Sequence, residues 1–220
     1  MNFDAARQNM VDCQIYTMGV IDQPILDAYR TIPRERFVLP GQEGIAYCDE
    51  DLPLGQGRFL MEPLVHARMV QAAKPRPDDV VLDIGTGTGY SAAIFSSLVT
   101  TVVATESHAG LLKQAEATWN SLSLCNIAGF ESALDKGAPE NAPYSLVFLG
   151  GAVAFVPERV LAQVAIGGRL ITVLMEEGSN VGKTTLIERL GEEQFSSRTL
   201  FDAATPYLPG LEPRRQFVFQ

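Results

Sequence analysis

The most constraining stretch of the sequence is VVLDIGTGTGY, residues 80–90, where an apolar run is followed by three glycines at every second position. The apolar run predicts a buried strand. Gly85, Gly87 and Gly89 then predict a tight turn, because glycine alone adopts positive φ at little cost. At such a strand-to-helix turn, main-chain N–H groups and the helix N-terminus can approach a ligand closely. We therefore expect a ligand site at this turn.

The spacing around the turn indicates which ligand it binds. A dinucleotide site of the form G-x-G-x-x-G requires glycine at position 90, where this chain has Tyr90. Asp83, two residues before the first glycine, would repel a pyrophosphate and attract a sulfonium or ammonium group. Glu106, 19 positions after Gly87, follows the second predicted strand and can accept hydrogen bonds from both ribose hydroxyls. These residues predict a site for S-adenosylmethionine, with a bare tight turn as the alternative.

Neighbouring side chains complete the predicted cofactor set. The set comprises Asp83, Gly85, Thr86, Gly87, Gly89, Tyr90, Glu106 and Ser107. Tyr90 also has an alternative interpretation as a packing residue, as do Trp119 and His66. A second glycine-containing stretch, GSNVGKTT, differs from a phosphate-binding loop because only three residues separate Gly178 from Gly182. We predict a hairpin turn there.

The pattern downstream of residue 76 alternates strands with helices. Strands are predicted at 80–84, at 101–105, near Ile127, and in the segments SLVFLG and LITVLM, with helices at about 90–97 and 109–122 and in VPERVLAQV. This alternation predicts an α/β fold: a Rossmann-like, doubly wound, mostly parallel sheet with helices on both faces. The β-rich segments GKTTLIERL, EQFSSRTLFDA and QFVFQ predict antiparallel strands at the sheet edge.

The N-terminal third has a different texture. FDAARQNMVDCQI, QPILDAYRTIP and PLVHARMVQAA have helical spacing, whereas DEDLPLGQGRFLMEP is loop-like. The prolines of KPRPDDV mark a boundary. We expect an N-terminal helical and loop segment, residues 1–75, packed on an S-adenosylmethionine-binding domain with a β-rich tail, residues 76–220, in a single globular unit.

Composition narrows the partners and the location. Hydrophobic residues make up 46% of the 220, enough for one sizeable core, and the formal net charge of −9 disfavours nucleic acid and anionic membranes. The first ten residues lack a signal-peptide pattern, so we expect a cytoplasmic protein. Cys13, Cys48 and Cys125 are too widely spaced for a metal site or a disulfide framework, and we expect small apolar fillers.

From about residue 4 to residue 176 the chain resembles the protein-L-isoaspartate O-methyltransferase family. RERFVLP and AYCDEDLPLGQG resemble the family's N-terminal segment, and VLDIGTGTGYSAA its cofactor loop. APYSLVFLGGA and VPERVLAQVAIGGRLI resemble its fourth and fifth strand units. The resemblance implies an enzyme that transfers a methyl group from S-adenosylmethionine to the α-carboxylate of isoaspartyl residues in damaged proteins or peptides.

The stretch after LPLGQG departs from the family. The family continues Q-T-I-S-x-P, with its Thr and Ser near the acceptor carboxylate, whereas this chain reads RFLMEP, so Phe59 and Met61 replace two hydroxyl side chains. Methyl transfer needs no general base here, because a carboxyl with a pKa near 4 is already ionised at neutral pH. The acceptor must still be held. Arg58 is the candidate, through two parallel hydrogen bonds, with a solvated loop arginine as the alternative; Met61 only marks the position of the family's Ser.

Further departures lie at strand ends. The family's G-D-G becomes S-A-L at 132–134, which removes the acid expected near the adenine, and its T-A-A becomes G-G-A at 150–152. These changes leave open a homologue that binds S-adenosylmethionine but has lost repair activity and serves another acceptor or a binding role. A nicotinamide-dependent oxidoreductase is disfavoured by Tyr90.

Overall fold

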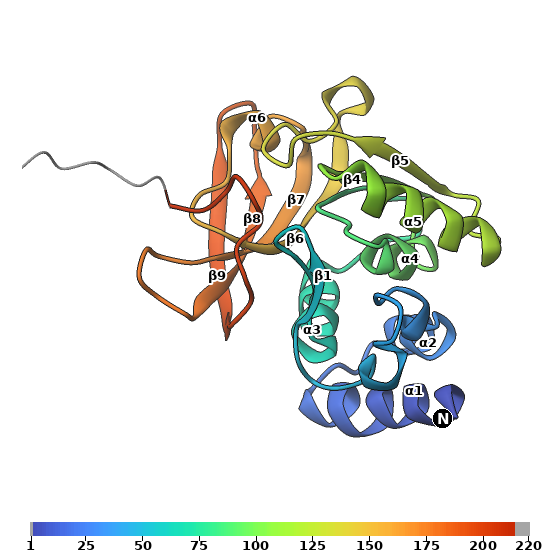
Figure 1. Cartoon of the computed structure of the whole chain (residues 1–220). Coiled ribbons are helices and arrows are strands. Elements are labelled where there is room, and N and C mark those ends of the chain that lie inside the picture. Colours follow the sequence, from blue (N-terminus) through green and yellow to red (C-terminus); the bar gives the residue numbers. More distant parts are fainter. Residues whose placement is uncertain (1, 214–220) are drawn as a thin grey trace, which may run out of the picture.

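A seven-stranded sheet forms the centre of the computed structural model, which describes residues 2–213 (Figure 1). Its strand order is β5-β4-β3-β6-β7-β8-β9; the pairs from β5 to β7 are parallel, and β8 runs antiparallel to β7 and β9. The strands are β3 (Val80–Ile84), β4 (Thr101–Glu106), β5 (Ile127–Glu131), β6 (Tyr144–Val153), β7 (Val164–Leu174), β8 (Gly182–Arg189) and β9 (Phe195–Ala203). The predicted fold class is confirmed, as are the two antiparallel tail strands and the hairpin turn before β8. The segment QFVFQ lies outside the described residues.

Two hydrophobic cores lie on opposite faces of the sheet. Alternate strand residues divide between them, so Val81 and Phe148 belong to one core while Leu82 and Val147 belong to the other. Helices α3 (Pro63–Ala73), α4 (Tyr90–Ser96) and α5 (Ala109–Ser121) cover the first core, and α6 (Glu158–Leu161) contributes to the second. Helices therefore cover both faces, as predicted. Within residues 2–213, no helix has the length and apolarity to cross a bilayer.

The helices of the N-terminal segment lie beneath α4, beside and below α3 (Figure 1). It comprises α1 (Phe3–Asn9), a π-helical turn (Met10–Ile15), 3-10 turns (Tyr16–Met18, Arg34–Arg36 and Glu43–Ile45) and α2 (Gln23–Thr31). Prolines occupy the first turns of α2 and α3, where a missing N–H costs nothing. Two of the three cysteines, Cys13 and Cys125, are exposed, so the expectation of buried fillers is wrong for them.

The stretch DEDLPLGQGRFLMEP contains a hairpin, and the prediction of a loop is wrong at its centre. Strands β1 (Leu52–Gly55) and β2 (Arg58–Leu60) pair antiparallel across Gln56 and Gly57, whose φ values are +54° and +70°. Positive φ at both central residues is the geometry of a two-residue hairpin turn. The two strands are too short for a pattern of alternating apolar and polar residues to predict them. The hairpin places Arg58 beside the glycine turn.

Candidate cofactor and acceptor site

The glycine turn lies where β3 ends and α4 begins, beside the carboxyl end of β4. Gly85, Gly87 and Gly89 all have positive φ, at +77°, +58° and +94°. The N–H groups of Gly85 and Thr86 donate to the Thr105 carbonyl on β4, at 2.9 and 3.0 Å. The N–H of Gly89 donates to the Thr86 carbonyl at 2.8 Å. In this structure these N–H groups therefore bond within the chain.

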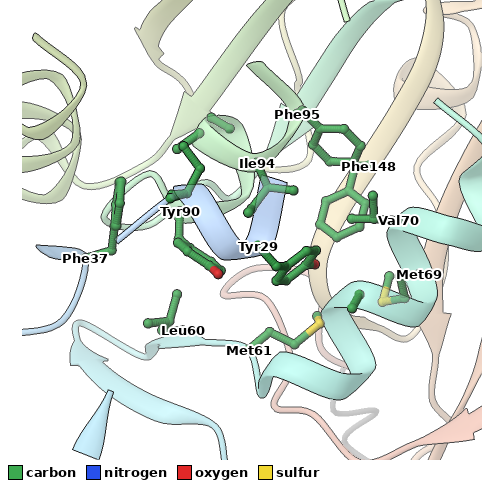
Figure 2. Close-up of a cluster of buried hydrophobic side chains, with 14 of the residues drawn as sticks. Tyr29, Phe37, Leu60, Met61, Met69, Val70, Tyr90, Ile94, Phe95 and Phe148 are labelled. Atoms are coloured by element: carbon green, nitrogen blue, oxygen red, sulfur yellow. The ribbon is translucent and has the colours of Figure 1, made fainter. Parts of the chain in front are cut away.

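The end of the turn is shaped by aromatic packing. A Cβ on Gly89 would lie 2.5 Å from Nε1 of Trp119, whose N–H donates to the Gly89 carbonyl at 2.9 Å. Tyr90 belongs to the buried cluster of Figure 2, with ring centroids 6.2 Å from Tyr29 and 5.4 Å from Phe37. Both Tyr90 and Trp119 therefore match their packing interpretation.

Glu106 ends β4 with its carboxylate toward the turn, and the side chain is fully buried. Its Oε2 accepts a hydrogen bond from the N–H of Gly87 at 2.8 Å. Its Oε1 accepts from the N–H groups of Ser107 and His108, at 2.8 and 3.2 Å, and from the Ser107 hydroxyl at 3.2 Å. Three members of the predicted cofactor set, Glu106, Gly87 and Ser107, thus meet at one carboxylate.

Arg58 binds the same carboxylate from the hairpin. Its Nε donates to Oε2 of Glu106 at 3.1 Å, and its Nη2 donates to the carbonyl of Gly85. The side chain is only 3% exposed, so the alternative of a solvated loop arginine is wrong. A Cβ on Gly85 would lie 2.7 Å from Nη2, which places the guanidinium directly against the turn.

Two leucines close the remaining space over the turn. Leu54, on β1, approaches to 3.0 Å from the place of a Cβ on Gly87, and Leu208 comes equally close to that of Gly85. Both side chains are buried. Neither was predicted from the sequence to belong to the site, since one lies in the unpredicted hairpin and the other over a hundred residues downstream of the turn.

The C-terminal segment at 205–211 holds Leu208 in place by bonding to the end of β6. The N–H of Leu208 donates to the Ala152 carbonyl at 2.8 Å, and the N–H of Ala152 donates to the Pro206 carbonyl at 2.9 Å. A Cβ on Gly151 would lie 2.9 Å from the Leu208 side chain. The glycine pair at 150–151 was therefore the available sequence signal for a close approach here.

Asp83 lies at the end of β3 and is completely buried. Its Oδ2 accepts a hydrogen bond from the Ser91 hydroxyl, whereas its Oδ1 has no hydrogen-bond partner among residues 2–213. Burial raises the pKa of Asp83 to about 6, opposed by the hydrogen bond from Ser91. Oδ1 of Asp83 thus retains a free acceptor position.

The predicted acceptor side of the site is apolar. Met61 is buried beside Leu60 below Tyr29 and Tyr90 (Figure 2), and its carbonyl accepts a hydrogen bond from Arg34 at 2.7 Å. A cavity of about 20 Å³ remains next to the turn, which is room for one water molecule. Its lining includes Leu60, Met61, His66, Thr86, Tyr90, Ser91 and Phe148.

The chemistry of these groups fits a nucleoside that carries a cation. Glu106 and Asp83 supply a ribose acceptor and a negative charge, and the positive-φ glycines remove side chains from the turn. Space is the obstacle, because small-molecule sites typically measure about 300–1,000 Å³. We call the space between the glycine turn at 85–89 and the Glu106 carboxylate the cradle. In this conformation Arg58, Leu54 and Leu208 occupy it, so the cofactor can fit only if Arg58 moves.

Solved structures place the fold in one class. A protein-L-isoaspartate O-methyltransferase matches with a TM-score of 0.81 and 24% identity over 95% of this chain and 67% of its own. A Plasmodium falciparum structure described as a putative protein-L-isoaspartate O-methyltransferase, in complex with S-adenosyl-L-homocysteine, matches with a TM-score of 0.75 and 17% identity over 94% and 97%. The fold is that of a Rossmann-like methyltransferase.

Sequence comparison identifies the family within that class. The family model described as protein-L-isoaspartate(D-aspartate) O-methyltransferase matches residues 5–209. Protein-L-isoaspartate O-methyltransferase 2 of Pelobacter propionicus is 34% identical over 96% of this chain and 93% of its own length. The Methylorubrum extorquens protein-L-isoaspartate O-methyltransferase is 37% identical over 88% and 83%. The chain belongs to the protein-L-isoaspartate O-methyltransferase family, which confirms the resemblance.

Proposed function

We propose that the chain is an S-adenosylmethionine-dependent carboxyl O-methyltransferase that acts on the α-carboxylate of isoaspartyl residues in proteins or peptides. One observation carries the proposal: in a chain of this family, the buried Glu106 carboxylate meets the Gly87 N–H at 2.8 Å at the carboxyl ends of β3 and β4. Ligands of open α/β sheets bind at that edge. None of the comparisons supports the alternative of a homologue that has lost repair activity.

The residues of the cradle have separate roles in this proposal. When bound, S-adenosylmethionine supplies a methyl group activated by its sulfonium. Glu106 would hold a ribose hydroxyl through Oε2 once Arg58 has left that atom. Asp83 would offer its negative charge and Oδ1, which has no partner among residues 2–213, to the cationic end. The glycine turn gives the nucleoside access to bare main chain.

The acceptor side needs positioning and exclusion of water, and no general base. An isoaspartyl carboxylate is ionised at neutral pH, and His66 is held neutral because burial lowers its pKa to about 3. Phe59 and Met61 supply an apolar wall where the family pattern has hydroxyl groups. A grip of Arg58 on the acceptor stays a prediction, since its guanidinium is bonded to Glu106 and Gly85 in this structure.

The test is methyl transfer to an isoaspartyl peptide, with the same peptide carrying normal aspartate as the control. Labelled S-adenosylmethionine at millimolar concentration should give product with the isoaspartyl peptide alone. The variant Glu106→Gln should reduce cofactor affinity, because a neutral amide replaces the proposed ribose acceptor. Cofactor binding without methylation of either peptide would contradict the proposed acceptor and favour the alternative.

A further inference from the structure

The chain's own side chains fill the space between the glycine turn and Glu106, where the nucleoside of the cofactor would lie. The contact that matters most is that of Arg58 with the Glu106 carboxylate. Five donors reach its carboxylate: three bonds on Oε1 from Ser107 and His108, and two on Oε2 from Gly87 and Arg58. An ionised carboxylate offers about four lone-pair sites. Gly87 and Arg58 occupy both lone-pair sites of Oε2, so a ribose hydroxyl can donate to Oε2 only when one of them leaves. Arg58 is the donor on a long, rotatable side chain, whereas the N–H donors are fixed by the backbone.

We propose that Arg58 is an internal competitor for the cofactor. Its guanidinium occupies the place of the ribose on Glu106, and S-adenosylmethionine binds only after expelling it. Because this contact must be broken first, Arg58 weakens cofactor binding in this chain relative to an Arg58→Gln variant. This inference rests on the proposed function, because it assumes that the cradle takes this cofactor.

The C-terminal segment at 205–211 packs against the residue that Arg58 binds. Leu208 is fully buried and packs within 3.0 Å of the place of a Cβ on Gly85, the residue whose carbonyl Arg58 binds. A Cβ on Gly150 would lie 3.2 Å from that same carbonyl oxygen. Arg58, Leu208 and Gly150 therefore lie close together around the Gly85 residue that Arg58 binds.

A purely structural role makes the opposite prediction for cofactor affinity. If Arg58 only stabilised the fold, its replacement would lower stability and leave affinity unchanged or reduced. An internal competitor requires affinity to rise when it is removed. The two roles are thus separated by the sign of one measurement.

The experiment is calorimetric titration of the full chain with S-adenosyl-L-homocysteine, comparing the wild type with Arg58→Gln. We expect the variant to bind roughly 10- to 100-fold more tightly, because a charge-assisted hydrogen bond of about 1.5–3 kcal/mol no longer competes. Arg198→Gln is the matched control, since Arg198 lies exposed on edge strand β9 and should leave affinity unchanged. Equal or weaker binding by Arg58→Gln would overturn the proposal while leaving the proposed function intact.

Two further measurements keep the test independent of how well Arg58→Gln folds. The wild type can be followed by the NMR signal of the Arg58 Nε–H, which should shift when the ligand displaces it from Glu106. Binding without such a shift would overturn the proposal. Leu208→Ala keeps the arginine but removes the side chain that packs beside Gly85, where Arg58 binds. This variant should therefore bind the ligand several-fold more tightly. Binding by none of the proteins would overturn the proposed function and this inference together.

Discussion

Two buried ion pairs lie at opposite ends of the parallel strands. They differ in how many other hydrogen bonds the acid of each pair accepts. At the start of β3, Arg169 holds both oxygens of Asp79, at 2.5 and 3.3 Å. Its guanidinium also donates to the carbonyls of Ala73, Lys74 and Ser145, which ties α3 to two strands. Burial alone would raise the pKa of Asp79, but hydrogen bonds led by Arg169 hold it below its usual range. This pair is a structural tie.

At the carboxyl ends of the strands, Arg58 contacts Glu106 through one nitrogen and Gly85 through another. Glu106 does not depend on that contact, since four further hydrogen bonds come from Gly87, Ser107 and His108. An acid that remains satisfied without its arginine can exchange that arginine for a ligand. The difference between the pairs shows that burial of an ion pair does not by itself reveal how far the acid depends on its arginine.

The largest effect should follow from breaking the structural tie. Arg169→Gln removes the cation from a buried carboxylate and frees three carbonyl groups, so we expect a loss of about 3–5 kcal/mol in the free energy of unfolding. Urea unfolding monitored by circular dichroism measures it, with Arg198→Gln as the control. A loss below that of Arg58→Gln would contradict the comparison.

Arg58→Gln should cost less stability in the absence of ligand. Glu106 keeps its hydrogen bonds from the backbone and Ser107, so we expect a loss of about 1–3 kcal/mol, measured in the same urea series. Saturating S-adenosyl-L-homocysteine should then stabilise this variant more than the wild type, because tighter binding adds more to stability at equal ligand concentration. A loss in the free energy of unfolding as large as that of Arg169→Gln would show that both ion pairs serve mainly to stabilise the fold.

The central sheet and the acid of the site were predictable because their signals are local. The apolar run at 80–84 ends at a glycine, and the structure places β3 at the same residues. Glu106 follows from its spacing to the turn, since the ends of adjacent parallel strands share one edge of a sheet. The expected strands at 80–84 and 101–105 needed only their own residues to be recognised.

The occupants of the cleft were not predictable, because they depend on contacts between distant residues. The hairpin that directs Arg58 inward is only a few residues long, too short for periodicity to indicate. Leu208 reaches Gly85 through backbone pairing with Ala152, and nothing in the local sequence around Leu208 specifies that partner. The sequence thus indicated which residues could bind a cofactor. Only the three-dimensional structure shows that Arg58, Leu54 and Leu208 fill the space beside them.

A smaller effect tests the segment that covers the cleft. Gly151→Ala places a Cβ 2.9 Å from Leu208 and 3.2 Å from the Pro206 carbonyl, so we expect a loss of about 1–2 kcal/mol from overpacking. Leu208→Ala should relieve the clash, and the double variant should be more stable than the sum of the single losses predicts. Additive losses in urea unfolding would show that the two positions do not interact.

The smallest effect concerns the pH dependence of stability at the start of α3. Burial, followed by the charges of Asp51 and Asp49, raises the pKa of Glu62 from 4.5 to about 7. Between these values the folded chain binds more protons at Glu62 than the unfolded chain does, so the Glu62 contribution to stability falls as pH rises toward 7 and stays low above it. Glu62→Gln removes this penalty.

Urea unfolding at pH 5 and pH 8 measures the Glu62 effect, because other titrating groups act equally in both proteins. We expect Glu62→Gln to gain stability relative to the wild type on going from pH 5 to pH 8. Asp22→Gln is a suitable control, since Asp22 is exposed, and should give a smaller difference between the two pH values. An unchanged gap between Glu62→Gln and the wild type would show that the Glu62 carboxylate is as well solvated in the folded chain as in the unfolded one, despite its place beside Asp51.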